Sequence, residues 1–254
     1  MSEPSPEEER DSVSAAFGQA LGAAAARAGL DPDAKASTGH VVWRAMGGWR
    51  GVAESVLPSL VFVVVYTATL ELVWSLVASV GIAVVFTAVR FAQKSPPASA
   101  LGGLVAAVAA AALALITGNP SDNFVPGLLT NLGYGVAMLV SAVVGWPVVG
   151  LVAGYLMGEG TRWRGDRRKR RTFFWLTIAW AGLFAARLIV QFPIYLSSLD
   201  AANRESAVAL LGTLKIAMGL PLFAPLLAVT WLAARSLYTR RTEAASDGSP
   251  STPE

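Results

Sequence analysis

Long apolar stretches separated by short polar ones dominate this chain. They cover residues 52–69, 72–89, 100–117, 126–158, 172–191 and 207–237. A helix needs about 20 mostly apolar residues to cross the hydrocarbon core of a bilayer. The pattern therefore predicts an all-α integral membrane protein, a bundle of six transmembrane helices.

The first two predicted spans lie in one continuous run, residues 55–90, in which Glu71 is the only internal charge. As a single helix this run would be about 52 Å long, and the hydrocarbon core is about 30 Å thick. The run must therefore fold back on itself, and we place the turn at residues 67–71. Before the start of this run, Arg50 and Glu54 stand four residues apart and can pair on a helix.

Prolines interrupt two of the later segments. Pro147 lies inside the fourth, and Pro221 and Pro225 lie inside the sixth. Proline removes a backbone donor and clashes with the preceding turn, so we expect the fourth and sixth helices to be kinked. Such breaks bind substrates or ions in transporters, but proline is also common in membrane helices in general.

Basic residues near the predicted span ends indicate an orientation. Six spans with both termini in the cytoplasm place fourteen flanking cations inside and Arg204 alone outside, as the preference of Lys and Arg for the cytoplasmic side requires. The largest group consists of Arg162, Arg164, Arg167, Arg168, Lys169, Arg170 and Arg171. We interpret it as a topology determinant that also holds anionic lipid headgroups. Ten residues contain no folded nucleic-acid-binding domain, so we expect no nucleic-acid partner.

Composition supports one membrane domain with polar ends, because 54% of the residues are hydrophobic and 15% are charged. We place the membrane domain at residues 41–238. Residues 1–40 are expected to be a disordered tail, first acidic and then alanine-rich, and residues 239–254 a second disordered tail. The single histidine, His40, is expected to be a solvated loop residue, and the absence of cysteine excludes disulfides and thiolate metal sites.

Polar side chains at membrane depth are the best candidates for a site, because an ion there is costly and tends to face a partner or water. Seven of them lie toward the predicted outer side: Arg187, Gln191, Lys215, Glu71, Asp122, Asn123 and Asn131. We expect them to line an outward-facing polar pocket, with Asp122 as the residue that decides whether the pocket exists. The alternative is that Arg187 and Lys215 extend to the lipid headgroups, or pair only to hold the bundle together.

The sequence contains no cluster of histidine and carboxylates, no nucleophile elbow and no phosphate-binding glycine loop. We therefore expect no enzyme, no cofactor and no metal site. Two classes of function remain. One is a transporter or channel-like protein for a small polar or ionic solute, and the other is a non-catalytic envelope scaffold for cell-wall synthesis or division. The expected partners are membrane lipids, a second copy of the chain or envelope proteins.

Five stretches carry a family resemblance: WRAMGGWRGVAESVLPSLVFVVVYT, ALITGNPSDNFVPGLLTN, GWPVVGL, DRRKRRTFFWLT and LKIAMGLPLFAPLL. In this order they resemble the actinobacterial multi-pass membrane proteins grouped as domain of unknown function 3159. That family is distantly similar to intracellular septation protein A, an inner-membrane protein connected with the cell envelope. The resemblance implies a multi-pass protein of a bacterial cell membrane (inner or plasma membrane) and transfers no site residue.

Overall fold

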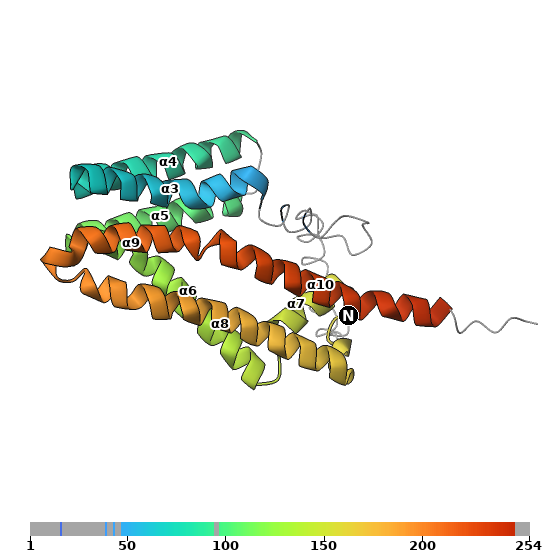
Figure 1. Cartoon of the computed structure of the whole chain (residues 1–254). Helices are drawn as coiled ribbons and strands as arrows, with labels where there is room; N and C mark the ends of the chain where they lie inside the picture. The colour runs from blue at the N-terminus through green and yellow to red at the C-terminus, as the bar shows by residue number, and fades with distance from the viewer. Residues whose placement is uncertain (1–15, 17–38, 40–42, 44–46, 94–96, 247–254) are drawn as a thin grey trace, which may run out of the picture. The chain divides into compact units, whose positions relative to one another are not determined.

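The structure is a computed structural model that describes residues 16, 39, 43, 47–93 and 97–246. His40 and most of the predicted N-terminal tail lie outside these residues. The regular elements of the described part are helices (Figure 1). They are α3 (Gly48–Thr69), α4 (Leu72–Ala92), α5 (Pro97–Thr117), α6 (Val125–Val143), α7 (Val148–Leu156), α8 (Arg167–Ser197), α9 (Arg204–Ala217) and α10 (Leu220–Ser246), with short 3-10 helices η1 (Pro120–Phe124), η2 (Arg162–Gly165) and η3 (Ala201–Asn203).

In the described residues, five helical stretches are long and apolar enough to cross a membrane. They are Gly48–Thr69, Leu72–Ala92, Pro120–Val143, Arg167–Ser197 and Ala201–Tyr238, and Leu101–Thr117 is a shorter apolar helix. Large apolar side chains point outward along them, with Ile116 83% and Ile189 72% exposed. An apolar surface of this kind suits lipid better than water. The prediction of an all-helical multi-pass membrane protein is confirmed at this level.

The turn between α3 and α4 falls inside the predicted interval. Leu70 adopts the left-handed conformation (φ 56°), and its N–H donates to the carbonyl of Tyr66 at 2.7 Å, which ends α3. The N–H of Glu71 donates to Thr69 Oγ1 at 3.2 Å before α4 begins. Local hydrogen bonds therefore make a tight reversal that needs no glycine.

Two helices extend beyond the predicted segments. The fifth span was expected to cover residues 172–191, and α8 runs from Arg167 through Pro193 to Ser197. The C-terminal tail was expected from residue 239, but α10 reaches Ser246. Arginine, lysine, glutamate and alanine are strong helix formers, so charged stretches extend the start of α8 and the end of α10 past their apolar parts.

The prolines sit at different places in the interrupted segments. Pro147 precedes α7 and follows the end of α6 at Val143. Pro221 occupies the first turn of α10, where proline is tolerated because its missing N–H has no helical partner, and Pro225 lies inside that helix. The helical path is thus broken after Val143 and between α9 and α10.

The helices group into two compact units, which we describe separately. The η1 unit comprises Met46–Val136 and Gly182–Phe223, and its core consists of Phe62, Tyr66, Leu76, Ala111, Ala114, Phe124, Val208 and Leu211. In it α3 packs against α4 and α9, and α5 packs against α4 and η1. Gly212 of α9 lies directly against Val63 of α3, so the absence of a side chain there lets these two helices approach closely.

The second unit, here the Trp163 unit, contains Ala137–Ala181 and Ala224–Glu254. Trp163 of η2 is fully buried, and its ring meets Phe173 of α8 edge to face at 5.3 Å. A side chain at Gly150 or Gly154 of α7 would collide with Trp163. These two glycines therefore form the slot that receives the indole.

Candidate functional site

The stretch GNPSDNFVPGLLTN, residues 118–131, folds into the η1 unit as part of its core. Asn119 precedes η1 and its Oδ1 accepts the N–H of Ser121 at 3.1 Å, while Pro120 occupies the first turn. All five residues of η1 are buried, and the ring of Phe124 meets that of Phe62 at 5.9 Å. The polar side chains of this stretch are therefore held inside the helix bundle and not in an open loop.

Asp122 is bound by a tyrosine. Its carboxylate is 6% exposed, and Oδ1 accepts the hydroxyl of Tyr195 from α8 at 2.7 Å. Within the described residues, Asp122 forms no ion pair with Arg187 or Lys215. The sequence proposed Asp122 as a lining residue of an outward-facing pocket and did not predict Tyr195 as its partner, because a tyrosine in an apolar span carries no charge signal.

Arg187 binds backbone at the break between α9 and α10. Its Nε donates to the carbonyl of Met218 at 2.7 Å, and its Nη2 donates to the same oxygen. Met218 follows the last residue of α9, where carbonyls lose regular intrahelical donors. The arginine therefore stabilises a helix end through hydrogen bonds to a neutral group.

The remaining predicted pocket residues occupy several positions. Lys215 Nζ lies 5.7 Å from the centre of the Phe124 ring, within the range of a cation–π contact. Asn123, Asn131 and Gln191 are buried, whereas Glu71 is exposed at the start of α4. The structure thus brings Lys215 and Asp122 to the same short helix, η1, and leaves Glu71 at the surface.

Spacing along α6 and α8 indicates where the buried amides lie. Asp122 meets Tyr195, and farther along the same two segments Gly135 and Tyr134 meet Phe184. The two segments therefore run antiparallel, with Asn131, Arg187 and Gln191 in the intervals between these contacts. We call Asp122, Asn131, Arg187, Gln191 and Tyr195 the polar cluster by their positions along these segments; among their described side chains, the hydrogen bond within the set is that between Tyr195 and Asp122.

Ser121 Oγ, beside this cluster, is fully buried and has no hydrogen-bond partner in the described part of the chain. Asn123, Asn131 and Gln191 are buried residues whose side chains also form no hydrogen bond there, but their polar atoms are not fully enclosed. An unsatisfied buried polar group costs about 1–3 kcal/mol. Such groups retain the capacity to bind water or a polar solute.

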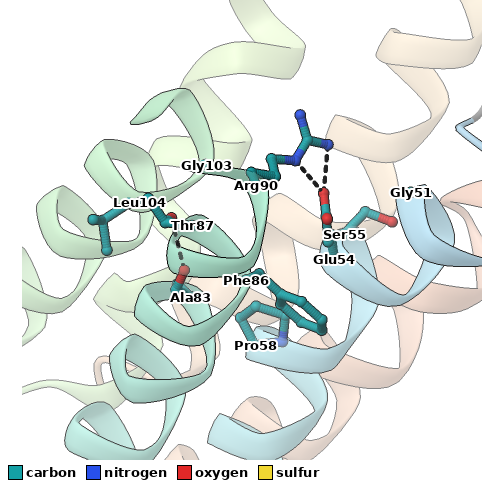
Figure 2. Close-up of a pocket in the computed structure, with 10 residues that line it drawn as sticks. All are labelled: Gly51, Glu54, Ser55, Pro58, Ala83, Phe86, Thr87, Arg90, Gly103 and Leu104. Carbon is teal, nitrogen blue, oxygen red and sulfur yellow. Dashed lines mark hydrogen bonds and ion pairs between the residues drawn. The ribbon is translucent and has the colours of Figure 1, made fainter. Parts of the chain in front are cut away.

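A second polar feature of the η1 unit lies near the beginning of α3 and the end of α4. It is a cavity of about 250 Å³ between α3, α4 and α5 (Figure 2). Its wall consists of Gly51, Glu54, Ser55, Pro58, Ala83, Phe86, Thr87, Arg90, Gly103 and Leu104. The Glu54 carboxylate accepts hydrogen bonds from both arginines. Arg50 Nε donates to Oε1 at 2.7 Å. Arg90 Nε donates to Oε2 at 2.7 Å, and Arg90 Nη2 donates to the same oxygen.

The sequence predicted the Arg50 and Glu54 pair, which is confirmed, but not the contribution of Arg90. Arg90 is 36 residues from Glu54, and its position in the sequence indicated only the orientation of the chain in the membrane. The turn at Leu70 explains the contact, because a helical hairpin brings residues from the two sides of its turn beside each other. Across the same hairpin, Ser79 Oγ donates to the carbonyl of Pro58 at 2.8 Å.

The basic segment, residues 162–171, is folded and not an open loop. It consists of η2 and the first turn of α8, and Arg164 covers the ring of Trp146 at 3.6 Å. Lys169 is 4% exposed, lies 2.6 Å from Glu159 Oε2 and covers the Tyr238 ring at 3.9 Å. Arg162, Arg167, Arg168, Arg170 and Arg171 are exposed. The headgroup interpretation therefore does not extend to Lys169, which has a structural ion pair.

Among the described residues, no group of three or more histidine, cysteine, aspartate or glutamate side chains is arranged to hold a metal ion.

The chain matches the family described as Protein of unknown function (DUF3159) over residues 46–241. It therefore belongs to that family. No curated protein matches it, and neither does any solved structure.

Proposed function

We propose that this family member is a multi-pass protein of a bacterial cell membrane, of actinobacterial lineage, that passes a small polar or ionic solute as a transporter or channel-like protein. It crosses the membrane six times with both termini in the cytoplasm. The five long apolar stretches supply five crossings, and α5, with 21 residues, supplies the sixth. The basic segment then lies on the cytoplasmic side.

The observation that carries the proposal is the set of buried amide side chains in the η1 unit. Asn123 of η1, Asn131 of α6 and Gln191 of α8 are buried residues, and their side chains form no hydrogen bond to another described residue. Burial of a polar group is costly unless the group is hydrogen-bonded. A polar solute that passes along these residues would supply such hydrogen bonds.

Helix breaks support movement of the solute. Arg187 holds the carbonyl of Met218 at the break between α9 and α10, and Pro221 and Pro225 follow in α10. Pro147 stands at the second break, before α7. Breaks of this kind let helix halves tilt and expose backbone carbonyls to a polar solute. Replacement of the Arg187 contact by solute contacts would couple binding to this change.

Flux through proteoliposomes tests the proposal, with radiolabelled K⁺, Cl⁻, phosphate and glycine as probes. The Gln191→Leu variant removes one buried amide at nearly constant volume, and Gln93→Leu, which changes an exposed glutamine at the end of α4, is the matched control. We expect the wild type to pass at least one probe, Gln191→Leu to reduce that flux about tenfold or more, and Gln93→Leu to retain it. Equal flux in wild type and protein-free liposomes for every probe would overturn the proposal.

A second candidate is a non-catalytic envelope scaffold that binds partners in wall synthesis or division. The bond between Tyr195 and Asp122 favours it, because this acid is satisfied inside the bundle and is not offered to a solute. The distant resemblance to intracellular septation protein A points the same way. Arg187→Met and Lys215→Met separate the candidates. Loss of both variants from the membrane supports the scaffold, and normal abundance with loss of flux excludes it.

A further inference from the structure

We propose that the cavity between α3, α4 and α5 is a binding site for a phosphate ester. Arg90, which lines the cavity, is its main anion-binding group, and Arg50, which lies outside the lining but shares Glu54 with Arg90, assists it. Glu54 occupies the place of the phosphate when the site is empty. The site lies away from the polar cluster, near the start of α3 and the end of α4. The inference stands whether or not the protein passes a solute. The phosphate ester is either the headgroup of an anionic phospholipid or a soluble molecule.

The charge of the site favours an anion. Arg50 and Arg90 both bind the one carboxylate of Glu54, so the three side chains carry one net positive charge. Arg50 Nη2 is buried and has no hydrogen-bond partner within the described residues. Guanidinium groups bind phosphate oxygens through paired N–H groups, and a phosphodiester carries the single negative charge that balances the site.

The shape and lining of the cavity favour an ester over a bare ion. About 250 Å³ lies between the charged end and an apolar wall that includes Phe86, Pro58 and Leu104 (Figure 2). Drug-sized pockets start at about 300 Å³, so this space suits a small carbon substituent. Pro58 has no N–H for the carbonyl of Glu54, four residues earlier in α3, so that carbonyl lacks its usual helical donor.

Glu54 has a specific role in this site. Its side chain is 12% exposed and its two oxygens accept from different arginines, Oε1 from Arg50 and Oε2 from Arg90. A phosphate that enters the cavity makes the same contacts and therefore competes with this carboxylate. Removal of the negative charge of Glu54 should strengthen phosphate binding. A carboxylate that only stabilised the fold would produce no such gain.

Two adjacent glycines of α5 provide a matched test of the cavity. Gly103 lines it and Gly102 does not, and a Cβ at either position would meet no atom within 4 Å. Gly103→Leu therefore fills the cavity without changing charge, and Gly102→Leu adds the same side chain to the neighbouring face. Both substitutions raise helix propensity, so neither is expected to unfold α5.

Apparent affinity is measured on the purified full chain in neutral detergent, from the rise in Tm as each probe is added. The probes are phosphatidylglycerol, phosphatidylcholine as the neutral lipid, and glycerol 3-phosphate. We expect phosphatidylglycerol to bind and phosphatidylcholine not to bind. Arg90→Gln and Gly103→Leu should each weaken binding about tenfold or more, Gly102→Leu should leave it unchanged, and Glu54→Gln should tighten it.

The outcomes distinguish a lipid headgroup from a soluble phosphate ester as the ligand. Binding of phosphatidylglycerol alone assigns the site to a lipid headgroup, and binding of glycerol 3-phosphate with the same variant pattern assigns it to a soluble ester. The proposal is wrong if neither probe binds, if the two glycine variants behave alike, or if Glu54→Gln weakens binding as Arg90→Gln does. Gly103→Leu keeps the test valid even if Arg90→Gln fails to fold.

Discussion

Tyr195 donates its hydroxyl to Asp122 at 2.7 Å and so links α8 to η1 across 73 positions of the chain. The acid lies in a short helix whose five residues are all buried. A buried carboxylate without a donor would be strongly destabilising. This one bond therefore allows the polar stretch between α5 and α6 to be part of the core.

Removal of the tyrosine hydroxyl should destabilise the η1 unit. Tyr195→Phe keeps the ring and leaves Asp122 without its donor, so we expect a loss of about 1–3 kcal/mol in the free energy of unfolding. The measurement is denaturant unfolding in detergent micelles. Tyr134→Phe, at a side chain that is 56% exposed, is the control and should stay near wild type. Equal stability of both variants would show that the bond contributes nothing.

The ion pair between Lys169 and Glu159 should be essential to the Trp163 unit. Lys169 is buried and Glu159 is partly buried, with its side chain 11% exposed, and Lys169 also covers the Tyr238 ring. Loss of one member of a buried pair leaves an uncompensated charge, which costs about 3–5 kcal/mol. We expect Lys169→Met to lower the abundance of the protein in membranes markedly, as measured by quantitative blotting. Arg170→Met changes the exposed neighbouring cation and should not, and a similar fall in both variants would indicate a general effect of basic charge.

A methyl group at Gly154 should disrupt the slot for Trp163. The added Cβ would collide with the carbonyl of Gly160 and with the indole, neither of which can move without shifting backbone or core. Gly154→Ala should therefore lower Tm, although alanine is the better helix former by about 0.5–1 kcal/mol. Gly133→Ala, in α6 with open space around the new Cβ, should keep or raise Tm. The reverse order of the two variants would contradict this packing.

The proposed membrane topology predicts opposite accessibility for two loops. The chain contains no cysteine, so maleimide labelling of a variant with one introduced cysteine comes from that residue alone. Ala202→Cys, between α8 and α9, should react with a membrane-impermeant maleimide in intact cells. Gly165→Cys, in η2, should react only after permeabilisation. Labelling of both residues in intact cells would exclude the six-crossing arrangement, and each position must label in detergent as a control.

The helical membrane architecture follows from the sequence alone, because apolar runs of sufficient length have few alternatives to helix in lipid. The turn at Leu70 was also predictable, since residues 55–90 are too long for one crossing. Pairing of Arg50 with Glu54 is a matter of local helix geometry and was expected for that reason. The end of α8 was not predictable from the local sequence, because the helix continues past Pro193 to Ser197.

The partners of the polar residues were decided by the tertiary structure. The sequence proposed Asp122 and Arg187 as candidate pocket residues, but only the tertiary structure directs them to Tyr195 and to the carbonyl of Met218. Arg90 reaches Glu54 because α3 and α4 fold into a hairpin. Hydrophobic length is a property of a segment and is visible in one chain, whereas the partner of a buried polar atom depends on which segments meet in three dimensions.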